Sequence, residues 1–217
     1  MTSPESTPSR AVRLGRPRAD QAGLVNERIL AAATTLFMEQ GFGRTTMDQV
    51  SALSQAGKST LYGRYPAKED LFSAVVQRSI ALVFNDLHMG PLTDSPARRL
   101  RHVGCELARN LLLPRCVKLM RIIAAEAENF PALAEGAYQA SSIGCRHSIE
   151  ATLRAADGTT QTVVDIPYLA TRFMEMTLQP LAFQAIMGGD HGDLLNKSVV
   201  DIDHTISLLV DSGQIPA

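Results

Sequence analysis

One short stretch of the chain carries small hydroxyl side chains of the kind that recognise a polyanion. Ser59, Thr60 and Tyr62 can donate hydrogen bonds to base edges or to phosphates. Leu61 and Tyr65 fall between them at helical spacing, and we expect them to hold a short helix in place. This pattern is typical of a helix whose outer face enters a major groove, which is wide enough for a single helix.

Positive charge lies where it can meet a phosphate backbone. Lys58 and Arg64 flank the hydroxyl residues, and Arg16 and Arg18 stand in an N-terminal arm. This arm, residues 1–21, is rich in Pro, Ser, Thr and Arg and has no hydrophobic period, so we predict a flexible basic segment. An Arg that enters a narrow minor groove and a solvated tail that attracts DNA non-specifically are both open interpretations.

The apolar spacing predicts the helices that would position these groups. A first helix is expected over 22–40. Thr45 or Thr46 can cap a second, short helix, and a third begins after a break at 55–57 and ends before Pro66. Two short helices joined by a tight break form a helix-turn-helix, the arrangement that presents the last helix to DNA.

The remaining sequence predicts further helices and no convincing strand. A short extended piece is conceivable only at 162–166, where no partner with matching alternation exists, so the expected fold class is all-α. The predicted boundaries rest on Pro, Ser, Asp and Gly at helix ends. The further helices are expected over 68–87, 95–113, 114–129, 131–156, 165–187 and 193–212.

Composition places the chain among globular cytoplasmic proteins. With 217 residues, 45% hydrophobic and 20% charged, it can bury a sizeable core. Three cysteines without CxxC spacing argue against a disulfide framework or a structural zinc site. No signal peptide and no run of roughly 18 apolar residues is present, so we expect a cytoplasmic protein. We also expect it to need no cofactor.

The N-terminal motifs resemble those of the TetR/AcrR family over about fifty residues, 22–72. The resemblance rests on Gly41-Phe42, Thr45-Thr46-Met47, Lys58-Ser59-Thr60-Leu61-Tyr62, Tyr65, Lys68-Glu69 and Leu71-Phe72. It implies a homodimer that binds a pseudo-palindromic double-stranded DNA operator and leaves it when a small-molecule inducer enters the C-terminal domain. It implies DNA contacts from Arg16, Arg18, Thr45, Thr46, Lys58, Ser59, Thr60, Tyr62, Arg64, Tyr65 and Lys68, with Tyr62 and Lys68 mainly on phosphates.

One position departs from the family pattern. The family usually has Gly-Val-Ser before its Lys, whereas this chain has Gln55-Ala56-Gly57. A residue other than glycine at the first of these positions puts the geometry of the turn in question.

The expected domains are a flexible arm at 1–21, a helix-turn-helix domain at 22–68 and a larger helical ligand-binding and dimerisation domain at 69–217.

The C-terminal region resembles the AefR-like branch of these regulators through the segment 119–135. The predicted helix 165–187 is apolar almost all round, and the family resemblance implies that it pairs with 193–212 in a four-helix dimer interface. A central helix of a monomeric core is the alternative. An apolar or amphipathic ligand would contact Leu112, Met120, Ile123, Phe130, Tyr138 and Phe173, although ordinary core packing needs the same side chains.

Other functions have weaker support in the sequence. His102, Cys105 and Glu106 share one helical face and could be drawn as a metal or redox site, but no fourth ligand is evident. We find none of the hydrolase, zinc-protease or phosphate-loop patterns, so the protein is not expected to be an enzyme. The alternatives are a helical small-molecule-binding enzyme and an interaction module that has lost DNA binding.

Overall fold

The protein is described by a computed structural model that covers residues 19–85, 87, 95–154 and 165–216. Every regular element within these ranges is an α-helix, so the expected all-α fold is confirmed. Residues 1–18 of the expected arm, with Arg16 and Arg18, and residues 162–164 of the possible extended piece at 162–166 lie outside the described residues, whereas 19–21 belong to the first helix and 165–166 begin a later one. Within the described ranges, no helix combines the length and the hydropathy that crossing a membrane requires.

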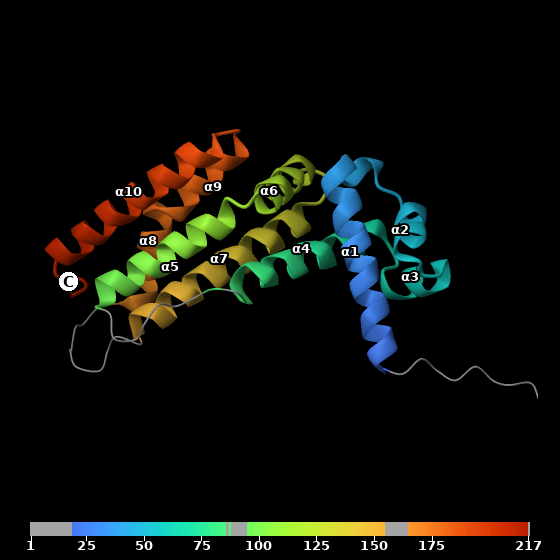
Figure 1. The fold of residues 1–217 in the computed structure, drawn as a ribbon, viewed down its shortest axis with the longest axis horizontal. Helices are drawn as coiled ribbons and strands as arrows, with labels where there is room; N and C mark the ends of the chain where they lie inside the picture. The colour runs from blue at the N-terminus through green and yellow to red at the C-terminus, as the bar shows by residue number, and fades with distance from the viewer. Residues whose placement is uncertain (1–18, 86, 88–94, 155–164, 217) are drawn as a thin grey trace, which may run out of the picture.

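Three helices form the N-terminal end of the molecule, at the opposite end from the C-terminus (Figure 1). They are α1 (Ala19–Arg44), α2 (Met47–Ser54) and α3 (Lys58–Arg64). The helix expected over 22–40 is therefore longer at both ends, but Gly41 interrupts it with a non-helical φ of 82° and ψ of 171°. Glycine adopts a positive φ without steric cost, which is why the chain turns there towards α2.

A small aromatic core holds these helices together. Phe37 and Phe72 are fully buried and meet edge to face with ring centroids 4.9 Å apart. Leu61 places the apolar side of α3 in the same core with no exposed surface, which stabilises the arrangement by about 1.5–3 kcal/mol. Burial of this one residue fixes which face of α3 turns outward.

The larger C-terminal body contains seven helices within the described residues. Pro residues open three of them, where the missing N–H costs no helical hydrogen bond. Figure 1 shows α5, α7 and α10 running side by side along this body, with α6 between these three helices and α1. The bounds are α4 (Lys68–Asn85), α5 (Pro96–Leu111), α6 (Pro114–Glu126), α7 (Pro131–Arg154), α8 (Ile166–Met176), α9 (Leu178–Ile186) and α10 (His191–Asp211).

The single helix expected over 165–187 is wrong, because the structure breaks it at Thr177. A proline ring clashes with the carbonyl four residues earlier, so Pro180 is incompatible with a continuous helix through Met176. Thr177 takes a φ of −120° and a ψ of −64°, and its buried hydroxyl donates to the Phe173 carbonyl at 2.6 Å. The break changes the direction of the chain between α8 and α9.

The core cluster of the N-terminal helices is shared by residues of the C-terminal body, which also has a second core cluster of its own. Leu119 of α6 and Ala137 of α7 are buried in the same cluster as the N-terminal helices. Phe130, between α6 and α7, meets the ring of Phe42 with centroids 4.9 Å apart. The shared core gives α6 direct contact with the helices that carry the motif.

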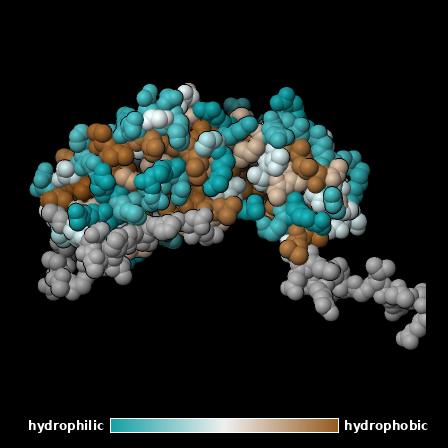
Figure 2. All heavy atoms as spheres, in the orientation of Figure 1, coloured by the Kyte–Doolittle hydropathy of each residue, from teal (hydrophilic) through white to brown (hydrophobic). Residues whose placement is uncertain are grey.

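Apolar side chains also reach the surface in patches over the larger body (Figure 2).

Candidate nucleic-acid interface

The outer face of α3 is the most polar and accessible part of the motif. Lys58, Ser59 and Thr60 are exposed, and the Tyr62 ring keeps 45% of its surface accessible. Leu61 between them has none, so the division of α3 into an outward and an inward face is as the sequence indicated. Hydroxyl and ammonium groups are the donors that phosphate oxygens and base edges accept.

The start of α2 is held by a capping box. Thr46 accepts a hydrogen bond from the Gln49 backbone N–H at 3.2 Å, and the Thr46 N–H donates to Gln49 Oε1 at 2.8 Å. Thr45 differs from the expectation that it faces DNA, because it is 1% exposed and donates its hydroxyl to the Gly41 carbonyl at 2.8 Å. We therefore assign Thr45 a structural role, while Thr46 stays at the surface.

The turn between α2 and α3 is left-handed at a residue with a side chain. Gln55 has a φ of 54° and a ψ of 27°, and among the described residues it is the one non-glycine with positive φ. The turn is closed by Ser51, whose hydroxyl donates to the Ala56 carbonyl at 2.7 Å, and by Ser54, which accepts from the Ala56 N–H. The geometry that glycine would favour is thus retained without it.

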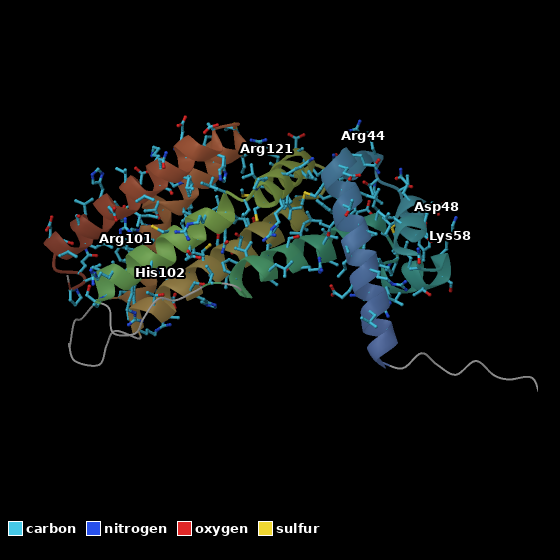
Figure 3. All side chains as sticks on the ribbon, in the orientation of Figure 1. Arg44, Asp48, Lys58, Arg101, His102 and Arg121 are labelled. Carbon is cyan, nitrogen blue, oxygen red and sulfur yellow. The ribbon has the colours of Figure 1, made fainter. Side chains whose placement is uncertain are left out.

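The cationic side chains of the motif differ in what they contact. Lys58 is free at the surface except for an ion pair with Asp48 at 2.8 Å, and this carboxylate raises the pKa of the Lys58 ammonium. Figure 3 shows both residues, with Arg44, at the end of the molecule that carries α2 and α3. Sequence reasoning missed Arg44 and Asp48, although their places beside the cap of α2 could have indicated them.

Three other expected contacts are engaged within the protein. Arg64 donates to the Ala22 carbonyl at 2.9 Å, which ties α3 to the start of α1. Tyr65 is half-buried and donates its hydroxyl to Asn26 Oδ1 at 2.9 Å. Lys68 donates to the Phe42 carbonyl at 2.9 Å and lies 4.3 Å from the centroid of that ring. These residues position the motif in the unbound protein.

A mostly apolar cavity of about 430 Å³ lies in the C-terminal body, and we call it the α7–α9 cavity. Met120, Ile123 and Tyr138 line it, as expected for a ligand site. Sequence reasoning missed Phe84 and Phe183, whose place on the cavity wall depends on how α4 and α9 pack. Its size is within the range of small-molecule sites, which is about 300–1,000 Å³.

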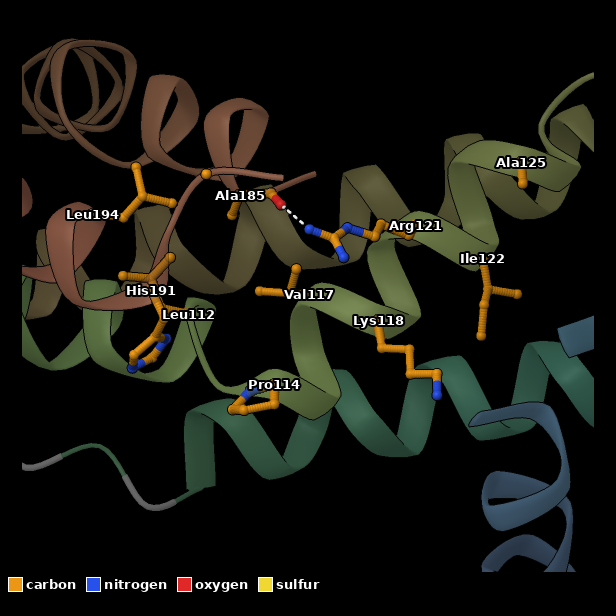
Figure 4. Close-up of a pocket in the computed structure, with 11 residues that line it drawn as sticks. Leu112, Pro114, Val117, Lys118, Arg121, Ile122, Ala125, Ala185, His191 and Leu194 are labelled. Carbon is orange, nitrogen blue, oxygen red and sulfur yellow. Dashed lines mark hydrogen bonds between the residues drawn. The ribbon is translucent and has the colours of Figure 1, made fainter. Parts of the chain in front are cut away.

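Three of the expected ligand residues do not line this cavity. Phe173 is 1% exposed in the C-terminal core, and Phe130 packs on Phe42. Leu112 borders a separate open groove of about 650 Å³ between α6 and the start of α10 (Figure 4). In that groove Arg121 donates to the Ala185 carbonyl at 2.7 Å and thereby fastens α6 to the end of α9.

Two of the three cysteines, Cys105 and Cys145, are buried, and Cys116 is half-buried. Burial raises the pKa of Cys105 and of Cys116, and it raises the pKa of Cys145 to about 12. A thiol that stays protonated is a poor nucleophile and a poor metal ligand. Within the described part of the chain, His, Cys, Asp and Glu form no group of three that could hold a metal ion. His102, Cys105 and Glu106, which share one helical face in the sequence, therefore do not form such a group.

Comparison with known proteins agrees with this geometry. Residues 29–75 match the family described as bacterial regulatory proteins, tetR family, and residues 98–206 match the C-terminal domain of AefR-like transcriptional repressors. An HTH-type transcriptional regulator of Mycobacterium tuberculosis is 36% identical over 70 residues, which is 32% of this chain and 35% of that relative. The match thus spans about a third of the length of this curated relative.

Solved structures share the fold over most of the chain. The flavonoid-responsive regulator FrrA is 25% identical with a TM-score of 0.68, covering 88% of this chain and 97% of its own. SmeT, the repressor of the Stenotrophomonas maltophilia multidrug efflux pump SmeDEF, is 24% identical with a TM-score of 0.62, covering 84% and 89%. SmeT has also been solved as a complex with triclosan.

Fold and motif together define a helix-turn-helix transcriptional regulator rather than an enzyme. The match to the C-terminal domain covers half of the chain and the N-terminal match adds the motif itself. The chain belongs to the tetR family of bacterial regulatory proteins.

Proposed function

We propose that the protein is a transcriptional repressor that binds a pseudo-palindromic operator as a homodimer and is released by a small apolar or amphipathic ligand. The observation that carries the proposal is the exposed face of α3, where Ser59, Thr60 and Tyr62 stand out from a helix anchored by the buried Leu61. Action on DNA places the protein in the cytoplasm, and it needs no cofactor for this role.

The proposed DNA contacts follow the accessibility of the side chains. Thr46, Ser59 and Thr60 are exposed at the starts of the two short helices, so we assign them to base edges or nearby phosphates. Tyr62 and Lys58 are assigned to phosphates, where a hydroxyl or an ammonium donates without reading the sequence. Arg64, Tyr65 and Lys68 would hold α3 at the angle that these contacts need. Arg16 and Arg18 are proposed to extend the contacts into the neighbouring minor groove.

Two exposed apolar surfaces support the homodimer. The side chains of Phe183 on α9 and of Met187, which caps that helix, are 62% and 67% exposed, and on α10 those of Val200 and Leu208 are 51% and 57% exposed. Large apolar groups at such exposure on neighbouring helices mark surfaces that another protein covers. A four-helix interface made by these helices and their symmetry mates would bury them.

The α7–α9 cavity supports the ligand half of the proposal. Its wall includes Leu119, Met120 and Ile123 of α6, and Leu119 also belongs to the core cluster of the N-terminal helices. A ligand that changes the position of α6 therefore acts on the elements that hold α3. FrrA is named as flavonoid-responsive and SmeT has been solved with triclosan, and both kinds of compound are aromatic, which is consistent with an apolar cavity.

Footprinting on the DNA beside the gene of this protein tests the proposal. We expect protection of a pseudo-palindrome whose half-sites are one helical turn, about 10–10.5 base pairs, or a multiple of it apart. Tyr62→Phe removes only a hydroxyl, and loss of a hydrogen bond to a charged phosphate lowers the affinity roughly tenfold to a hundredfold. Tyr168→Phe is the matched control, because Tyr168 is exposed on α8 far from α3. Absence of sequence-selective protection at every salt concentration contradicts the proposal.

A further inference from the structure

The α7–α9 cavity opens to the surface mainly on one side. Four of its five exposed lining residues belong to two helices, with Tyr138 and Ser141 on α7 and Gln179 and Phe183 on α9. The fifth is Ala124 on α6. The rest of the lining is buried or half-buried. The mouth is therefore framed by α7 and α9, and we call the exposed residues of these two helices its lips.

Two aromatic rings stand at this mouth with most of their surface in water. Tyr138 is 56% exposed and Phe183 is 62% exposed, although both also line the cavity. Apolar surface left in water is unfavourable relative to a covered state, in proportion to its area. Rings in such positions gain stability when either a ligand or another protein surface covers them.

Both lips lack charge over long stretches. Residues 136–145 of α7 contain no Asp, Glu, Lys, Arg or His, and residues 176–189, which include all of α9, contain none either. Helices that face solvent carry charged side chains, whereas the centres of protein interfaces are depleted of charge and enriched in Met and aromatic residues. Met176, Phe183 and Met187 are exposed within the second stretch, so its composition is that of an interface.

The occupant that these observations favour is a second copy of this chain. The uncharged surface of α9 belongs to the same helix pair, α9 with α10, whose exposed apolar residues support the homodimer. A twofold interface uses the same patch on both subunits, and an uncharged apolar patch is complementary to itself. Phe183 belongs both to this patch and to the cavity wall, so the two sites are continuous.

We propose that the second subunit closes the mouth of the α7–α9 cavity between Tyr138 and Phe183, so that the ligand site is complete only in the dimer. This inference rests on the proposed function for the existence of the ligand site and of the homodimer. Because binding free energies are reciprocal, a ligand that prefers the dimer must also strengthen dimerisation, by the same factor for each ligand bound.

The test measures probe affinity as a function of association state. N-Phenyl-1-naphthylamine, an apolar fluorescent dye, is titrated into the full chain above and below its dimer dissociation concentration, which sedimentation determines in parallel. The double variant Val200→Glu/Leu208→Glu disrupts the dimer through residues outside the cavity lining. Leu24→Glu is the matched control, since Leu24 is 68% exposed on α1 and leaves both the cavity and the interface intact.

We expect the dimer and the Leu24→Glu control to bind the dye alike, and the monomer to bind it about tenfold more weakly or worse. Saturating dye should lower the dimer dissociation constant of the wild-type chain. Equal dye affinity in monomer and dimer overturns the inference and leaves the proposed function in place. A dimer that binds no dye contradicts the ligand half of the proposed function and the inference with it, whereas DNA binding is decided separately by footprinting.

Discussion

Replacing Gln55 by glycine should stabilise the protein, because the turn before α3 requires a left-handed backbone. A residue with a Cβ pays about 1–2 kcal/mol for this conformation, and Gln55 has a φ of 54°. Glycine avoids this strain but adds freedom to the unfolded chain, which costs about 0.5–1 kcal/mol. The difference leaves a net gain in the free energy of unfolding of about 0.5–1 kcal/mol.

Thermal unfolding followed by far-UV circular dichroism measures this gain. For a chain of this size, 1 kcal/mol corresponds to roughly 2–4 °C in Tm, so we expect a rise of about 1–4 °C. Gln55→Ala is the matched control, because it removes the exposed amide and keeps the Cβ that causes the strain. A Tm for Gln55→Gly that does not exceed that of Gln55→Ala would contradict a strained left-handed backbone at residue 55.

Three further predictions follow from individual contacts. Asp48→Asn frees Lys58 from its ion pair in each subunit, so operator binding by the dimer should tighten and its log–log salt slope should steepen by about 1.8, which is about 0.9 for each lysine, with Asp211→Asn as the charge-matched control. Gly104→Ala places a Cβ 2.8 Å from the Phe173 ring and should cost about 1–3 kcal/mol in urea unfolding, whereas Gly136→Ala, with open space around it, should not destabilise. Burial raises the pKa of Cys145 from 9.0 to about 12, so the protonated thiol contributes its full stabilisation below pH 9. Above pH 9 the free energy of unfolding should fall by about 1.4 kcal/mol per pH unit, and Cys145→Ala should make this fall shallower in unfolding measured against pH.

The N-terminal half of the fold could be predicted because its signals are local. The capping Thr46, the proline that follows α3 and the alternation of Leu61 with hydroxyl residues each depend on a few neighbouring positions. The starts of α5, α6 and α7 were equally readable from their prolines. The break at Thr177 was readable as well, from Pro180, but the uniform hydrophobicity of the segment concealed it.

The candidate ligand site could be predicted only in part, because a cavity depends on how distant helices pack. Met120 and Ile123 line it, whereas Phe173 fills the core, and all three look alike in the sequence. The burial of Thr45 likewise follows from a hydrogen bond to Gly41 that no spacing indicates. Apolar composition identifies which side chains leave water, and tertiary packing decides whether they leave a space between them.

The central claim is that the exposed face of α3 reads an operator sequence. Selection of bound fragments from genomic DNA by the purified chain, repeated with Ser59→Ala/Thr60→Ala, tests it most directly. We expect the wild-type chain to recover one shared pseudo-palindrome and the variant to recover sites with relaxed preference at the same positions in each half-site. Recovery of fragments without a shared sequence by the wild-type chain, or an identical sequence by the variant, would contradict it.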